Sequence, residues 1–99
     1  MLNKVVIMGR LTADPKLSKT NGGISVCTFN IACDRDRGEE CDFFPVVAWR
    51  GAAEWAERYL EKGKQIAVEG RLVTRKWTDK EGNNHKETEI NAEQLYFAG

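Results

Sequence analysis

The chain has 99 residues, of which 41% are hydrophobic, and this fits one compact domain spanning residues 1–99. Its 15 Lys and Arg residues balance its 15 Asp and Glu residues, so the formal net charge is zero. This balance excludes a uniformly basic protein, and any surface that attracts a polyanion must be local. No apolar run approaches the roughly 20 residues that span a bilayer, and the N-terminal residues lack the apolar stretch of a secretion signal. We expect a soluble, cytoplasmic protein.

The three cysteines, Cys27, Cys33 and Cys41, are an odd number and show no CxxC spacing. Cys27 and Cys33 fall in one predicted strand, where a separation of six residues corresponds to about 20 Å. That distance is too long for a disulfide within the chain. We therefore expect three reduced thiols, no metal site and no cofactor.

The first half of the chain has the pattern of three strands separated by polar connections. Alternating apolar residues predict strands at Asn3–Leu11, Ile24–Cys33 and Asp42–Trp49. Pro, Asn and Gly residues predict turn and loop over residues 12–23. The polar run from 34 to 42 predicts an exposed, mobile loop.

Both faces of the third predicted strand are apolar. Phe43, Pro45, Val47 and Trp49 alternate with Phe44, Val46 and Ala48. Only one face can point into a small barrel, so the other needs a different cover. Pro45 has no amide hydrogen, which predicts an edge or a gap in the pairing at this point.

The second half begins with a helical period. Residues Gly51–Lys62 place their apolar side chains on one arc, and Gly63 predicts the end of the helix. Strands follow at Gln65–Thr78 and His85–Phe97, joined by a hairpin turn. Five strands with one short helix between the third and fourth predict an all-β, five-stranded oligonucleotide-binding (OB) barrel.

Aromatic residues and arginines on the strands form the candidate functional pattern. Unpaired nucleic acid offers bare base faces and a phosphate chain, so a binder needs flat side chains and spaced cations. Phe43 and Trp49 share one strand face about 20 Å apart, which suits a linear polymer better than a single ligand ring. On the next strand, Trp77 has the same parity as Arg71 and Arg75.

Core packing is the alternative interpretation of each aromatic residue, because aromatic residues in strands are usually buried. For Trp77, the charged residues on the same face favour an outward position. Arg35 and Arg37 lie in a run of mixed sign, and two interpretations stay open for them: phosphate contacts or a solvated loop.

Four segments together resemble the bacterial single-stranded DNA-binding proteins, and the similarity covers essentially all of the chain. The segments are Leu2-Asn3-Lys4-Val5 continuing through Gly9 to Pro15, Val46 to Arg50, Tyr59 to Gly63, and Val68 to Trp77. The resemblance implies an OB barrel that binds single-stranded DNA with little sequence preference, in a homotetramer around which the strand wraps. It implies roles in DNA replication, recombination and repair, in the cytoplasm at the nucleoid. The expected DNA-contacting residues are Phe43, Trp49, Trp77, Arg71, Arg75, Arg10, Arg35, Arg37 and Arg50.

The chain differs from many members of this family in three respects. It has no aromatic residue between Cys33 and Phe43, which suggests that this loop contacts phosphate rather than base. Pro45 replaces a residue that is usually polar. The Gly/Pro/Gln-rich tail and acidic tip that recruit repair enzymes do not follow Gly99, so tail-mediated recruitment is not expected.

Two other classes of function remain to be weighed. An enzyme is disfavoured, because the single histidine, His85, lies beside a turn and no nucleophile–base pattern accompanies it. A protein–protein module is the stronger alternative, since one fold supports many functions and the net charge is neutral. Exposure of the face that carries Trp49 and Trp77 discriminates between DNA binding and a sealed protein interface.

Overall fold

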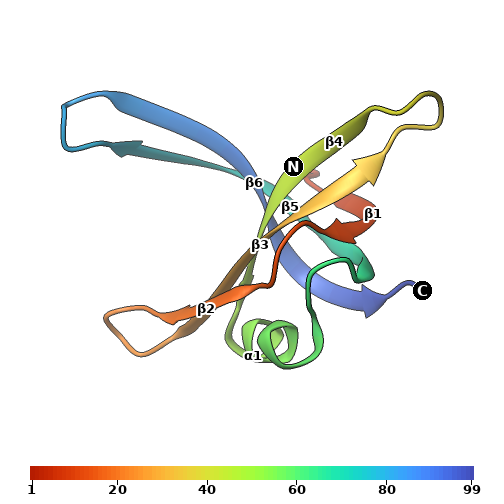
Figure 1. The fold of residues 1–99 in the computed structure, drawn as a ribbon. Coiled ribbons are helices and arrows are strands. Elements are labelled where there is room, and N and C mark those ends of the chain that lie inside the picture. Colours follow the sequence, from red (N-terminus) through yellow and green to blue (C-terminus); the bar gives the residue numbers. More distant parts are fainter.

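The structure, a computed structural model, describes all 99 residues as six strands and one helix. The elements in chain order are β1 (Val5–Leu11), β2 (Lys16–Lys19), β3 (Ser25–Asp34), β4 (Cys41–Trp49), α1 (Arg50–Tyr59), β5 (Gln65–Thr78) and β6 (Asn84–Phe97). Five of the strands form a closed barrel with the neighbour order β1-β5-β6-β4-β3, because β1 also pairs with β3. The predicted OB barrel is confirmed (Figure 1).

Gly9 permits the barrel to close where β1 meets β3. A Cβ atom at this position would lie 2.7 Å from the carbonyl oxygen of Ala32 and 2.9 Å from Sγ of Cys33. Contacts this short are not tolerated, so only glycine lets the two strands approach closely enough to pair.

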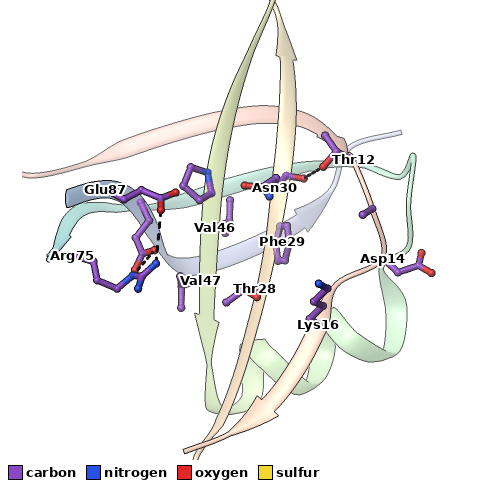
Figure 2. A pocket seen from close by; sticks show the side chains of 13 residues that line it. Thr12, Asp14, Lys16, Thr28, Phe29, Asn30, Val46, Val47, Arg75 and Glu87 are labelled. Carbon is purple, nitrogen blue, oxygen red and sulfur yellow. Dashed lines mark hydrogen bonds and ion pairs between the residues drawn. The ribbon is translucent and has the colours of Figure 1, made fainter. Parts of the chain in front are cut away.

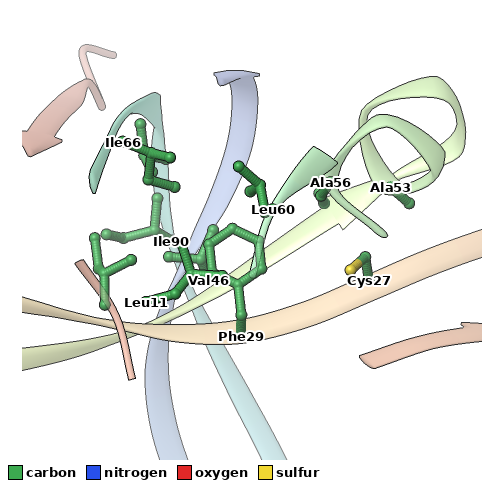
Figure 3. Packing of buried hydrophobic residues seen from close by; sticks show 12 residues of the cluster. Leu11, Cys27, Phe29, Val46, Ala53, Ala56, Leu60, Ile66 and Ile90 are labelled. Atoms are coloured by element: carbon green, nitrogen blue, oxygen red, sulfur yellow. The ribbon is translucent and has the colours of Figure 1, made fainter. Parts of the chain in front are cut away.

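The barrel core is made of side chains that alternate inward from the strands and of one face of α1 (Figure 3). Ile31, Val46, Ile66, Val68 and Ile90 are almost completely buried in it. Burial of such branched side chains is the main stabilising contribution to a small barrel.

Helix α1 covers one end of the barrel through Ala53 and Ala56, both fully buried. The predicted helix ran to Lys62, but the observed helix ends at Tyr59. Leu60 adopts an extended conformation and turns its side chain into the core, which stops the helix before Gly63.

Strand β2 was not predicted, because residues 12–23 were expected to be turn and loop. It pairs with β3 from Lys16↔Thr28 to Lys19↔Ser25. All four of its residues are exposed and its sequence, KLSK, lacks apolar alternation. Polar, lysine-bearing strands at a sheet edge are common because they discourage edge-to-edge aggregation, and such strands give no periodic signal.

Two long hairpins project from the barrel, β3–β4 and β5–β6 (Figure 1). The β3–β4 connection is shorter than the predicted loop, because β3 continues to Asp34 and β4 begins at Cys41. At the root of the β5–β6 hairpin, a β-bulge at Glu69/Gly70 shifts the register. The three cysteines are free thiols, and burial raises the pKa of Cys27 to about 11. No helix in the structure is both long and apolar enough to cross a membrane.

Candidate nucleic-acid interface

The outer face of β4 presents two aromatic rings to solvent. Phe44, Val46 and Ala48 point inward, and Phe43 and Trp49 therefore point outward, with 64% and 42% of their surface exposed. Val47 lies between them on the same outer face. The parallel pairing of β4 with β6 includes Val46 and Val47 only, so the expected gap in pairing at Pro45 is present on this side.

A groove of about 340 Å³ runs across the outer faces of β3 and β4 (Figure 2). Thr28, Asn30, Pro45 and Val47 lie along it. One wall comes from the connection between β1 and β2, with Asp14 and Lys16, and the other from the β5–β6 hairpin, with Arg75, Glu87 and Glu89. Because Pro45 and Val47 separate Phe43 from Trp49 on β4, the groove lies between the two exposed rings.

Trp77 on β5 is also exposed, at 37%, but its indole ring already has neighbours. The imidazole of His85, its partner across the hairpin, stacks on the indole with centroids 5.1 Å apart and an interplanar angle of 15°. The guanidinium of Arg75 lies 4.3 Å from the ring centroid. Trp77 is thus held in place before any ligand binds.

His85 is in turn fixed by the hairpin turn, a contact that was not predicted from the sequence. Its Nε2 lies 2.7 Å from a carboxylate oxygen of Asp79, and this contact, with backbone amides of the turn, lowers the pKa of Asp79. The other oxygen of Asp79 accepts hydrogen bonds from the amides of Glu81 and Asn83. A hairpin turn over residues 79–83 places His85 opposite Trp77, so the turn signal in the sequence could have identified this pair.

Arg75 is shared between the ring and two carboxylates. Its guanidinium lies 3.7 Å from Glu87 and 3.5 Å from Glu89 across the hairpin. Arg71, on the same face of β5, is exposed and forms no ion pair. Of the two arginines predicted on this strand, Arg71 has the more available charge.

The predicted cations Arg10 and Arg35 are paired within the protein. Arg10 donates two hydrogen bonds to Asp34, at 2.9 and 3.2 Å, and together with the Cys41 thiol it lowers the pKa of Asp34 to about 2. Arg35 contacts Asp42 and Glu40, and its hydrogen bonds lower the pKa of Asp42. These contacts connect the two ends of the β3–β4 loop, which was expected to be mobile.

Arg37 and Arg50 are exposed and unpaired. Arg37 lies in the exposed turn of the β3–β4 hairpin. Arg50 follows Trp49 directly and has a φ of 56°, in the left-handed region that non-glycine residues rarely adopt. This conformation turns the chain sharply from β4 into α1, and such strain is often retained at functional sites.

Comparisons with known proteins agree with this arrangement. A model described as the single-strand binding protein family matches residues 2–98. The single-stranded DNA-binding protein of Caldanaerobacter subterraneus subsp. tengcongensis is 43% identical over 102 residues, which cover 98% of this chain and 68% of the relative. Single-stranded DNA-binding protein 3 of Clostridium acetobutylicum is 44% identical over 101 residues, covering 97% and 70%. Single-stranded DNA-binding protein 2 of Listeria innocua is 43% identical over 102 residues, covering 98% and 64%.

These relatives are longer than the chain, which spans roughly two thirds of each, but the similarity extends over nearly all of its own residues. The closed barrel with its exposed aromatic face agrees with the similarity in sequence. The chain belongs to the single-strand binding protein family.

Proposed function

We propose that the protein binds single-stranded DNA across the outer faces of β3 and β4 and against the β5–β6 hairpin, with bases stacked on Phe43, Trp49 and Trp77. The observation that carries this proposal is that one groove is lined by neighbours of all three exposed rings. Pro45 and Val47, which lie between Phe43 and Trp49 on β4, form part of its floor, and Arg75, which contacts Trp77, forms part of its wall. Stacking accepts any base, so binding has little sequence preference.

The proposed role is to protect single-stranded DNA during replication, recombination and repair, in the cytoplasm at the nucleoid. Membership of a family of non-enzymatic binding proteins supports a binding role rather than catalysis. Three relatives that align with nearly the whole chain carry the name single-stranded DNA-binding protein. The isolated chain exposes Trp49 and Trp77, as a DNA site and a protein interface both require, and membership of this family favours the DNA site.

The test is a fluorescence and anisotropy titration with oligo-dT and with duplex DNA of the same length. Trp49→Ala and Trp77→Ala should each weaken binding by about 1–3 kcal/mol, because each loses one stacked base. A Trp55→Phe background removes the signal of the helix tryptophan. Tyr59→Ala is the matched control, since Tyr59 is an exposed aromatic residue on α1 outside the groove. Unchanged affinity in both tryptophan variants would refute the stacking assignment.

We also propose that the protein forms a homotetramer. On the outer side of β1, Val6 and Met8 are 69% and 55% exposed, although both barrel faces of this strand were expected to be partly covered. Met8 pairs with Ala67, which pairs with the exposed Tyr96, so the apolar patch continues over β5 and β6. None of these residues lines the groove. Light scattering should give four times the chain mass, and the mass of a single chain would contradict the assembly.

A further inference from the structure

The two faces of the β5–β6 hairpin beyond the barrel differ in charge. The face with Trp77 carries Arg75, Glu87 and Glu89 besides His85. The opposite face consists of three cross-strand pairs that contain no acidic residue: Thr74↔Thr88, Lys76↔Lys86 and Thr78↔Asn84.

Lys76 and Lys86 are directly opposite each other on neighbouring strands. Like charges at such positions destabilise a hairpin. Neither lysine forms an ion pair, whereas Arg75, one residue away, lies near two carboxylates. No carboxylate therefore compensates the repulsion between the two ammonium groups in the free protein. An anion bound between them would compensate it.

The surroundings of the lysine pair suit a phosphate group. A hollow of about 360 Å³ at this part of the hairpin is lined by residues of both faces: Lys76, Thr78, Asn84 and Lys86 from the face of the lysine pair, and Trp77 and His85 from the other. The Thr74 and Thr88 hydroxyls flank the lysines, and hydroxyl groups are frequent donors to DNA phosphates. On the Trp77 face, Glu87 and Glu89 already engage the guanidinium of Arg75, so Trp77 offers a ring for a base rather than a free cation beside it for a phosphate.

The edges of the hairpin leave room for a strand to pass. Strand β5 pairs with β1 only as far as Gly70, and β6 pairs with β4 only at Ile90 and Asn91. Between these limits and the turn, β5 and β6 pair with no other strand. The side chain of Asn3 hydrogen bonds with the backbone of Leu72 close to the barrel, and the outer edges beyond Leu72 are unpaired. The hairpin projects away from the barrel body (Figure 1).

We propose that Lys76 and Lys86 form a phosphate-binding site on the face of the hairpin opposite Trp77. This inference rests on the proposed DNA path: the strand whose base stacks on Trp77 turns around the edge of the hairpin, and one of its next phosphates lies between the two lysines. The DNA then contacts both faces of the hairpin, with a base on one face and a phosphate on the other.

The test compares Lys76→Gln, Lys86→Gln and the double variant in oligo-dT binding across salt concentrations. Because the two lysines share one phosphate, the double variant should reduce the slope of log K against log salt by roughly 0.7, equivalent to about a fivefold loss of affinity at 0.1 M salt, and each single variant should reduce it by less. Lys86→Arg should retain the slope, because it retains the charge. Lys80→Gln, in the exposed turn, is the matched control and should bind as the wild type does.

Two further readouts separate the site from a structural effect and from the proposed function itself. The tryptophan quenching at saturating DNA should be unchanged in the double variant, and its melting temperature should not fall, because a repulsive pair has been removed. A single neutral methylphosphonate linkage, moved along the oligonucleotide, should weaken wild-type binding at one position and leave the double variant unaffected there. Wild-type slopes in both lysine variants, with Trp77→Ala still weakened, would overturn the phosphate site alone. Failure of the wild type to bind single-stranded DNA would overturn the proposed function.

Discussion

The β3–β4 and β5–β6 hairpins both project from the barrel (Figure 1). They differ in how many of their charged side chains form ion pairs. On β3–β4, Asp34 pairs with Arg10, and Arg35 pairs with Asp42 and Glu40, which leaves Arg37 in the turn unpaired. On β5–β6, Arg75 pairs with Glu87 and Glu89, but Arg71, Lys76 and Lys86 have no carboxylate partner. Only the second hairpin carries an aromatic pair, Trp77 and His85.

This difference shows that a count of cations does not measure a DNA-binding surface. A phosphate that approaches Arg10 or Arg35 must displace a carboxylate that already satisfies the guanidinium. A phosphate that approaches Arg71 or Lys86 displaces only water and counterions, which favours binding. We therefore infer that β5–β6 contributes most of the phosphate contacts, while the ion pairs of β3–β4 mainly hold its shape.

The largest expected effect is a loss of stability from a change at the root of the β5–β6 hairpin. A Cβ atom at Gly70, in the bulge at the root of β5–β6, would overlap the carbonyl oxygen of Asn91. Gly70→Ala should therefore force the strands apart and lower the free energy of unfolding by about 1–3 kcal/mol. DNA affinity should fall too, because the hairpin changes direction. Urea unfolding and oligo-dT titration measure the two effects.

Gly38→Ala, in the turn of β3–β4, is the comparison variant. Gly38 has a φ of +84°, and a Cβ atom at this position would have no other atom within 4 Å, so only backbone strain opposes the change. We expect a loss of about 1 kcal/mol in stability and no change in DNA affinity. Equal losses of affinity in the two glycine variants would contradict the division of roles between the hairpins.

The sequence pattern could predict the barrel, the strand parity and the exposed rings, because each depends on periodicity within one strand. Parity alone separated Phe43 and Trp49 from the core side chains of β4, and the resemblance identified which face was outer. The arginine contacts could not be predicted in this way. Arg10 meets Asp34 only because β1 closes on β3, and Arg35 meets Asp42 only through the β3–β4 register. The polar strand β2 escaped prediction because it lacks an apolar period.

The second prediction compares one arginine from each hairpin. Arg71→Gln should lower oligo-dT affinity by roughly fivefold at 0.1 M salt and reduce the salt slope by about 0.7, because an unpaired cation is lost. Arg35→Gln should change affinity by less than about twofold, because its charge is already engaged by two carboxylates. Anisotropy titrations at several salt concentrations measure both. Arg58→Gln on α1 controls for the general loss of one positive charge, and a larger effect of Arg35→Gln than of Arg71→Gln would reverse the comparison.

The smallest expected effect is an increase in DNA affinity. Asp34→Asn removes the carboxylate that engages Arg10, and the freed guanidinium should raise oligo-dT affinity by about twofold, since exposed ion pairs are weak. Asp36→Asn removes the same charge from the loop without releasing an arginine, because Asp36 forms no ion pair. The difference between the two variants therefore isolates Arg10 from the general change in net charge.

The pH dependence of Asp34→Asn sharpens this result. Because the pKa of Asp34 is lowered from 3.8 to about 2, its carboxylate is fully ionised from pH 5 to 8, and the gain in DNA affinity should be constant over that range. The stability that the Arg10–Asp34 pair contributes is present above pH 3.8 and is lost as the pH falls towards 2. The melting temperature of Asp34→Asn should consequently fall less steeply than that of the wild type between pH 4 and pH 2. If the acid dependence flattened while DNA affinity stayed at the wild-type value, Arg10 would be a structural residue of the β3–β4 hairpin and would have no part in the DNA site.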